Sequence, residues 1–274
     1  MNKLKSLRRY KYLSFSENSL QIIKSGTIKF TKPSEFNDPF DCDPEYKDNV
    51  NNLLKKRPDL VKKAGQFLNL SKEQLIVEKP IMAERLKKAI EAGCFGQPAS
   101  DNVGICSLSR DPLNLLMWAH YSKDHTGFVV EFDIPIESFD LPKKDVGYFE
   151  KLIPHKVYYQ DFKPIVSFSD DNDVKITKQF LTKGSVWKYE QEERVIDYIR
   201  KSGIHAYDQK NILFSVIAGM RMKDSELSKL EDAVKNINKE KGLNVSFYKA
   251  TPLKGKFELF IKERPELRSQ CDLQ

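Results

Sequence analysis

The chain has 274 residues, of which 40% are hydrophobic and 31% charged, a composition typical of a folded globular protein rather than a disordered one. No apolar run approaches the roughly 18 residues that cross a bilayer, and the basic N-terminus is followed by polar sequence, so we expect a cytoplasmic protein without a membrane partner. The net charge of +7 favours acidic partners such as nucleic acid. The four cysteines form no C-x-x-C pair, which argues against a zinc knuckle.

The first third of the chain alternates strand and helix patterns and then becomes charged and helical. A strand is predicted from Arg9 to Ser14 and another from Thr27 to Thr31, with a short apolar helix between them. Residues 33–43 are rich in Pro, Asn and Asp and are predicted to form a loop. Residues 47–92 are periodic and charged, which predicts a helical insertion within a single α+β domain spanning residues 1–274.

The rest of the chain mixes strands and helices. Val103 to Ser109 is a buried-strand candidate, Asp111 and Pro112 predict the start of a helix through Tyr121, and Gly127 to Phe132 is a strand. Further strands are expected at 155–160, 189–198, 212–218, 245–249 and 257–261, with helices near 173–183 and 224–240. Because no regular βαβ repeat appears, these elements predict an α+β fold.

The stretch from Trp187 to Ile196 places charged groups where a strand is expected. If it is extended, Glu190, Glu192 and Arg194 share one face. Like charges on a sheet face repel, but in a cleft one carboxylate can steady positive charge while the other orients a hydroxyl or acts as a base. A solvated edge strand, or a helix with an i,i+4 pair between Glu190 and Arg194, remains the alternative.

A loop from Asn37 to Asp43 concentrates three carboxylates. Asp38, Asp41 and Asp43 are a candidate set of oxygen ligands for a hard cation. The loop lacks the glycine and the spacing of an EF-hand, and Asn or Asp before Pro is typical of a turn. A cation site and a capped turn are therefore both compatible with this loop.

Two further clusters carry candidate polar groups. His120 lies at the C-terminal end of an apolar helical stripe, and its separation of five residues from His125 is not that of a zinc-binding helix. Ser107 and Ser109 share one face of a strand, where hydroxyls bond a ribose, hold a neighbouring carboxylate or simply end the strand. Each cluster is thus interpretable as a binding group or as a structural one.

The order of these motifs resembles the bacterial domain-of-unknown-function family numbered 2971. The motifs are Tyr10-Lys11-Tyr12, the N-D-P-F-D loop at 37–41, Met117-Trp118 with His120-Tyr121, His125 with Gly127, and Trp187 with Glu190, Glu192 and Arg194. They fit over roughly residues 8–260. The family name implies no activity.

A second resemblance implies an activity. The basic and aromatic strand from Arg9 to Tyr12, the Ser107-Leu-Ser109 strand and the late Glu190-Gln-Glu192 segment look like the Arg, Ser-x-Ser and Glu-x-Glu series of ADP-ribosyltransferases. The resemblance implies split, largely antiparallel sheets with NAD bound in the cleft between them. It implies that Glu192 steadies the ribosyl cation formed as nicotinamide leaves, and that Glu190 orients or deprotonates the acceptor.

The same resemblance implies how the cofactor is held. Arg9 would meet the NAD phosphates, with Lys11 as the alternate, and Ser107 would place the nicotinamide side. The other cofactor-binding candidates are Tyr10, Ser109, His120 and Tyr121, and no metal ligand is assigned. The chain departs from the series in having leucine between the serines, where threonine is common, and in the long helical insertion between Arg9 and Ser107.

We therefore expect an NAD-dependent ADP-ribosyltransferase, a bacterial toxin or antiphage effector that modifies nucleic acid or protein and has a cognate antitoxin as a further partner. One alternative is a metal-dependent nuclease that uses Asp38, Asp41, His120 and Glu131. The other is a non-catalytic module that binds nucleic acid or a partner protein through the 47–92 insertion and the basic patches, with a steep dependence on salt.

Overall fold

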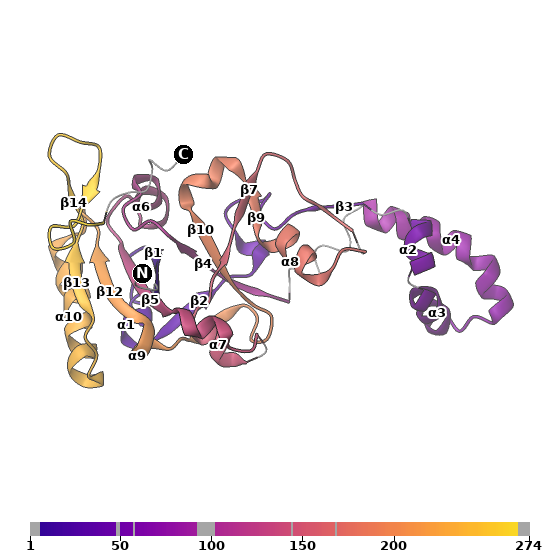
Figure 1. Cartoon of the computed structure of the whole chain (residues 1–274), viewed down its shortest axis with the longest axis horizontal. Helices are drawn as coiled ribbons and strands as arrows, with labels where there is room; N and C mark the ends of the chain where they lie inside the picture. Colours follow the sequence, from indigo (N-terminus) through magenta and orange to yellow (C-terminus); the bar gives the residue numbers. More distant parts are fainter. Residues whose placement is uncertain are drawn as a thin grey trace. The chain divides into compact units, whose positions relative to one another are not determined.

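The computed structural model describes residues 6–47, 50–56, 58–91, 102–143, 145–167 and 169–267. The chain divides into two compact units (Figure 1). The first consists of Met1–Lys32, Val103–Tyr159 and Ser185–Gln274, and the second of Pro33–Asn102 and Gln160–Gly184. Mixed helices and strands around a mostly antiparallel sheet confirm the predicted mixture of helix and strand.

A seven-stranded sheet forms the centre of the first unit, in the order β13-β12-β5-β1-β4-β10-β6. Its strands are β1 (Ser6–Leu13), β4 (Gly104–Ser109), β5 (Phe128–Pro135), β6 (His155–Lys156), β10 (Glu192–Asp197), β12 (Leu213–Ala218) and β13 (Ser246–Lys249). Neighbouring strands are antiparallel, except that β12 and β13 run parallel. This sheet brings together segments that are far apart in the sequence.

Alternation of side chains gives the sheet two buried faces. On one, the α10 face, Val130 and Val195 pack in a core with residues of α1 (Gln21–Lys24), α9 (Gln209–Ile212) and α10 (Asp224–Lys241). Figure 1 shows α10 running alongside β12 and β13. On the other, the α6 face, Tyr12 and Val129 pack against Trp118 of α6 (Leu115–Tyr121). Strands β5 and β12 therefore carry buried apolar side chains on both sides, as strands of a sheet covered on both faces do.

The sheet opens beside β1. Strand β1 pairs with β5 from Ser6 to Leu13 but meets β4 at the pair Tyr10 and Ser109. Nearer its start, β4 bonds instead to Thr31, which follows β2 (Thr27–Phe30), and β2 pairs with β11 (Gly203–Ala206). Strand β1 thus separates from β4 and β2 along its C-terminal half.

The second unit contains the helices that the structure describes in the charged 47–92 segment, where a helical insertion was expected. These are α2 (Val50–Lys56), α3 (Pro58–Phe67) and α4 (Lys72–Glu91), while residues 48, 49, 57 and 92 lie outside the described residues. Buried Val50, Leu53 and Leu54 form a small core among them. The unit also holds η1 (Pro33–Glu35), β3 (Glu45–Tyr46), β8 (Ile165–Val166), α8 (Asn172–Phe180) and β9 (Thr182–Gly184).

The remaining elements are short connectors: η2 (Ile136–Asp140), α7 (Val146–Glu150), β7 (Tyr158–Gln160), η3 (Ser185–Glu190), β14 (Thr251–Pro252) and β15 (Leu259–Phe260). No helix within the described part of the chain combines the length and the apolar character that a bilayer crossing needs.

Helix α6 begins three residues later than predicted. The Asp111 carboxylate accepts the Leu113 amide at 2.8 Å, which makes a turn around Pro112 instead of a first helical turn. The side chain of Asn114 then caps the helix by accepting the amides of Leu116 and Met117 at 3.0 and 3.1 Å. Asn114 also donates through Nδ2 to a backbone carbonyl of η3, so one side chain both starts α6 and ties it to η3.

Replacing Asn114 by alanine is expected to lower the free energy of unfolding by about 0.5–2 kcal/mol, because two amides at the helix start lose their acceptor. Asn114→Ser keeps an uncharged oxygen that caps the helix and loses the Nδ2 donation, so it should cost less. Urea unfolding of both variants measures the difference. Equal costs would show that the tie to η3, and not the cap, carries the effect.

Candidate functional site

A buried carboxylate lies where α6 and η3 meet. Glu190 is the last residue of η3 and is 2% exposed. Its Oε1 accepts the hydroxyl of Tyr121, from the end of α6, at 2.5 Å. The hydroxyl of Ser109, at the end of β4, donates to the backbone carbonyl of Glu190 at 2.7 Å. Helix α6 therefore holds the side chain of Glu190, and β4 holds its backbone.

A row of aromatic rings lies beside the carboxylate. It runs from Trp187 through Tyr189 and His120 to Tyr121, with neighbouring ring centroids 6.1, 5.9 and 6.4 Å apart. His120 is exposed, and its Nδ1 lies 2.9 Å from the Tyr189 hydroxyl. We call these four residues the aromatic row. Tilted and edge-to-face rings of this kind offer both flat surfaces and polar tips to a ligand.

A second buried carboxylate follows on β10. Glu192 is 5% exposed and accepts Nε and Nη2 of the fully buried Arg194 at 2.8 and 2.9 Å. The backbone amide of Glu192 donates to the hydroxyl oxygen of Tyr159 at 2.8 Å. A two-pronged bond from a guanidinium is the geometry that best compensates a carboxylate removed from water. Glu192 is consequently held in one position.

The predicted strand from residue 189 to 198 is shorter in the structure. Gln191 has a φ of 45°, in the left-handed region, and this residue separates η3 from β10. Glu190 therefore lies in a helical turn, whereas Glu192 and Arg194 share one face of β10 as predicted. A single left-handed residue breaks the alternation on which the prediction for Glu190 depended.

The serine strand lies next to these acids. In the register of the sheet, Tyr10, Ser109 and Glu192 form one row across three strands, and Ser107 lies opposite Arg194. Residues directly opposite each other point to the same face, here the α6 face. The structure thus gathers Tyr10, Ser107, Ser109 and Glu192 on one side, with Glu190, His120 and Tyr121 at its edge.

The two basic candidates lie on the other side of the sheet. Arg9 and Lys11 alternate with Tyr10 and Tyr12 along β1, so they point to the α10 face. Arg9 donates Nε and Nη2 to Glu193 at 2.6 and 2.9 Å. The structure therefore does not bring Arg9 together with Ser107 and Glu192 around one ligand, because neighbouring residues of a strand face opposite ways.

A further buried carboxylate, Glu131 on β5, was predicted only as a nuclease ligand. It is fully buried, and Oε1 accepts Tyr10 and Arg8 at 3.3 and 3.5 Å. Its Oε2 accepts Arg264 at 3.2 Å and the Ser215 hydroxyl. Burial, together with Glu131, raises the pKa of Tyr10, so that hydroxyl remains a donor. Both oxygens of Glu131 are taken up by the protein's own donors.

The acidic loop behaves as a turn with ion pairs. Asp38 Oδ1 accepts the Phe40 amide at 2.9 Å, the capped turn considered for this sequence. Asp43 forms an ion pair with Lys163 at 2.6 Å. Asp41 forms an ion pair with Lys183 of β9 at 3.5 Å. Among the described residues, no group of three or more His, Cys, Asp or Glu side chains is arranged to hold a metal ion.

The ring of His125 stacks on the ring of Trp118 in α6. Its ring lies 6.3 Å from that of Trp118 at an angle of 9°. Burial, aided by the positive charge of Arg221 and opposed by Asp124, lowers the pKa of His125 below its ordinary value. The neutral imidazole is thus the form that fits the folded protein.

Acidification should therefore destabilise the protein through His125. Because its folded pKa is depressed, the unfolded chain takes up the proton first as the pH falls below about 6.5, the usual pKa of histidine. The stability that neutral His125 supplies is present above that pH and is lost below it. Urea unfolding at pH 7.5 and 5.5 should show a larger acid-induced loss for the wild type than for His125→Asn. Equal losses would contradict the assignment.

Comparison with known proteins supports the family expected from the sequence. A model of the family described as "Protein of unknown function (DUF2971)" matches residues 117–195. The matched stretch starts within α6 and ends within β10, so it contains the aromatic row, Glu190, Glu192 and Arg194. No curated protein and no solved structure matches the chain.

Proposed function

We propose that this chain, which matches the DUF2971 family over residues 117–195, is an NAD-dependent ADP-ribosyltransferase that acts through Glu190 and Glu192. The observation that carries the proposal is the buried Glu190 carboxylate, held by Tyr121 at 2.5 Å beside the exposed ring of His120. Carboxylates in sites of low dielectric act strongly on developing positive charge and on nearby protons. Transfer of ADP-ribose needs both actions, because positive charge develops on the ribose and the acceptor hydroxyl loses a proton.

In the proposed reaction, the bond between the nicotinamide nitrogen and C1 of the ribose breaks, and its electron pair leaves with nicotinamide. The ribosyl cation that forms is steadied by Glu192, whose position Arg194 fixes. A hydroxyl of the acceptor then bonds to C1, and its proton passes to Glu190. The hydroxyl of Tyr121 orients the carboxylate of Glu190 for that transfer.

The aromatic row supplies a surface for the rings of the dinucleotide. Flat heteroaromatic rings stack on tyrosine, tryptophan and histidine, and His120 offers a polar edge at the rim. Arg9 is assigned no part in this site, because Glu193 holds its guanidinium on the opposite face of the sheet. The net charge of +7 favours an acidic acceptor, nucleic acid or protein, as expected for a toxin or antiphage effector countered by an antitoxin.

The test is incubation of the purified protein with NAD labelled in the adenylate, in three separate mixtures. One contains bacterial RNA, one a protein extract, and one no acceptor. Release of nicotinamide with label on RNA or protein supports transfer, and release of free ADP-ribose without acceptor shows hydrolysis of the same bond. Absence of nicotinamide release from all three mixtures would refute the proposed function.

A further inference from the structure

The turn between β14 and β15 carries the most exposed large apolar side chain of the described residues. This side chain is Phe257, which is 97% exposed. The backbone amide of Leu253 donates to the carbonyl of Glu258 at 2.8 Å and closes the turn, and Gly255, with a φ of 80°, supplies its left-handed backbone. Figure 1 shows the turn in yellow, projecting past the end of β13. We call residues 253–258 the hairpin tip.

The hairpin that carries this tip is positively charged. Residues 249–262 contain four lysines and one glutamate, a net charge of +3. Lys254 and Lys256, on either side of Gly255, are both exposed. Glu258 lies 3.5 Å from Lys256, but both side chains are more than a third exposed, so water and salt screen the pair. The hairpin therefore attracts a polyanion.

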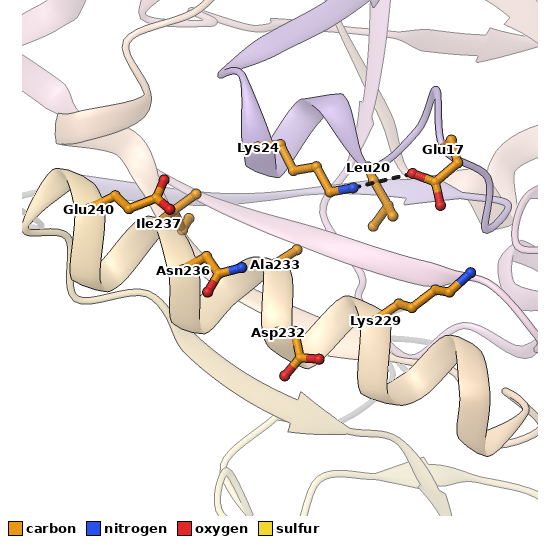
Figure 2. A pocket seen from close by; sticks show the side chains of 9 residues that line it. All are labelled: Glu17, Leu20, Lys24, Lys229, Asp232, Ala233, Asn236, Ile237 and Glu240. Carbon is orange, nitrogen blue, oxygen red and sulfur yellow. Dashed lines mark hydrogen bonds and ion pairs between the residues drawn. The ribbon is translucent and has the colours of Figure 1, made fainter.

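The hollow between α1 and α10 shows the contrast (Figure 2). It has a volume of about 480 Å³, and its apolar lining residues, Leu20, Ala233 and Ile237, are buried in the core. Its charged lining has both signs, namely Glu17, Lys24, Lys229, Asp232 and Glu240. This hollow offers a ligand neither a single sign of charge nor an exposed ring, whereas the hairpin tip offers both.

An exposed ring between lysines suits a nucleic-acid strand. Phenylalanine stabilises a fold by being buried, so a ring left in water contributes nothing of this kind. A flat ring stacks on any unpaired base, and ammonium groups bind the phosphates beside that base. The bases of a duplex already stack on one another, so the ring fits a single strand. A membrane surface fits less well, because stable membrane association needs more apolar area than one ring supplies.

We propose that the hairpin tip binds single-stranded nucleic acid, with Phe257 stacked on a base and with Lys254 and Lys256 at the adjacent phosphates. Binding at this tip does not depend on the proposed transferase activity, because it uses none of the residues assigned to that reaction. It adds a contact surface for nucleic acid outside the charged 47–92 insertion.

The test is fluorescence anisotropy of a short labelled single strand, as RNA and as DNA, titrated with the full chain. Wild-type protein should bind both strands, and more weakly as salt rises, because phosphate contacts release counterions. Phe257→Ala should weaken binding by about tenfold, the effect of losing one stacked base. Phe162→Ala removes a phenylalanine that is 85% exposed elsewhere on the protein and should leave the affinity unchanged.

Two further variants separate stacking from charge. Phe257→Leu keeps an apolar side chain but loses the flat ring, so it should weaken binding as much as Phe257→Ala does. Lys254→Glu should weaken binding and reduce its dependence on salt. Lys239→Glu, on the exposed side of α10, makes the same charge change outside the hairpin and should have little effect.

Vesicles that contain phosphatidylserine form the second arm of the test. Binding of wild-type protein to these vesicles, without binding to either single strand, would overturn the proposal in favour of a membrane surface. Equal losses from Phe257→Ala and Phe162→Ala, or failure of wild-type protein to bind a single strand at low salt, would overturn it as well. Glu190→Gln should bind the single strand as wild type does, so failure of this proposal and failure of the transferase proposal are distinguishable.

Discussion

Glu190→Gln is expected to lower kcat for transfer of ADP-ribose to the acceptor by about 10²- to 10⁴-fold, the usual contribution of a positioned acid or base. The amide keeps the shape of the side chain and an oxygen that accepts the Tyr121 hydroxyl. It loses the negative charge and the ability to take a proton. The fold should therefore survive, and the rate should not.

The measurement is a single-turnover assay of label transferred from NAD to the acceptor, with urea unfolding of the same preparation. Glu84→Gln, an exposed substitution on α4, is the matched control and should behave as wild type. Tyr121→Phe should lose less, about tenfold, because it removes only the hydrogen bond that orients the carboxylate. A Glu190→Gln protein that is folded and retains the wild-type rate would remove Glu190 from the mechanism.

The site itself was partly predictable from the sequence. Alternation along a strand correctly placed Glu192 and Arg194 on one face of β10. The same rule failed at Glu190, because Gln191 adopts a left-handed conformation and nothing in the local sequence, such as a glycine or asparagine, signals it. Tyr159 carries no sequence signal of its contact with Glu192 either, since that contact joins residues 33 positions apart.

Long-range pairing explains why the proposed basic contacts did not converge with the acids. Alternation alone places Arg9 and Lys11 on one face of β1 and Tyr10 on the other. Whether the basic side chains or Tyr10 share the face of Glu192 depends on the register between β1, β4 and β10. A shift of one residue in that register would exchange the two sets. Propensity and spacing do not determine the register, because it is set by packing of the whole sheet between two layers. The elements were therefore easier to predict than the faces on which they place their charges.

The largest effect on stability is expected at Arg194. Its side chain is fully buried and makes a two-pronged bond to Glu192, which is itself 5% exposed. Arg194→Met should lower the free energy of unfolding by about 3–5 kcal/mol, because it leaves a buried carboxylate without its counter-charge. Urea unfolding monitored by tryptophan fluorescence measures this loss.

The double variant Arg194→Met, Glu192→Leu should recover most of that loss. Replacing a buried ion pair by apolar side chains of similar volume is commonly neutral or stabilising, whereas removing one partner is costly. The double variant should nevertheless lack transferase activity, because Glu192 is gone. Recovered stability without recovered activity would show that the pair is retained for chemistry, since folding does not need it. If the double variant were as unstable as Arg194→Met, the loss would come from packing around Arg194 and not from the unpaired charge.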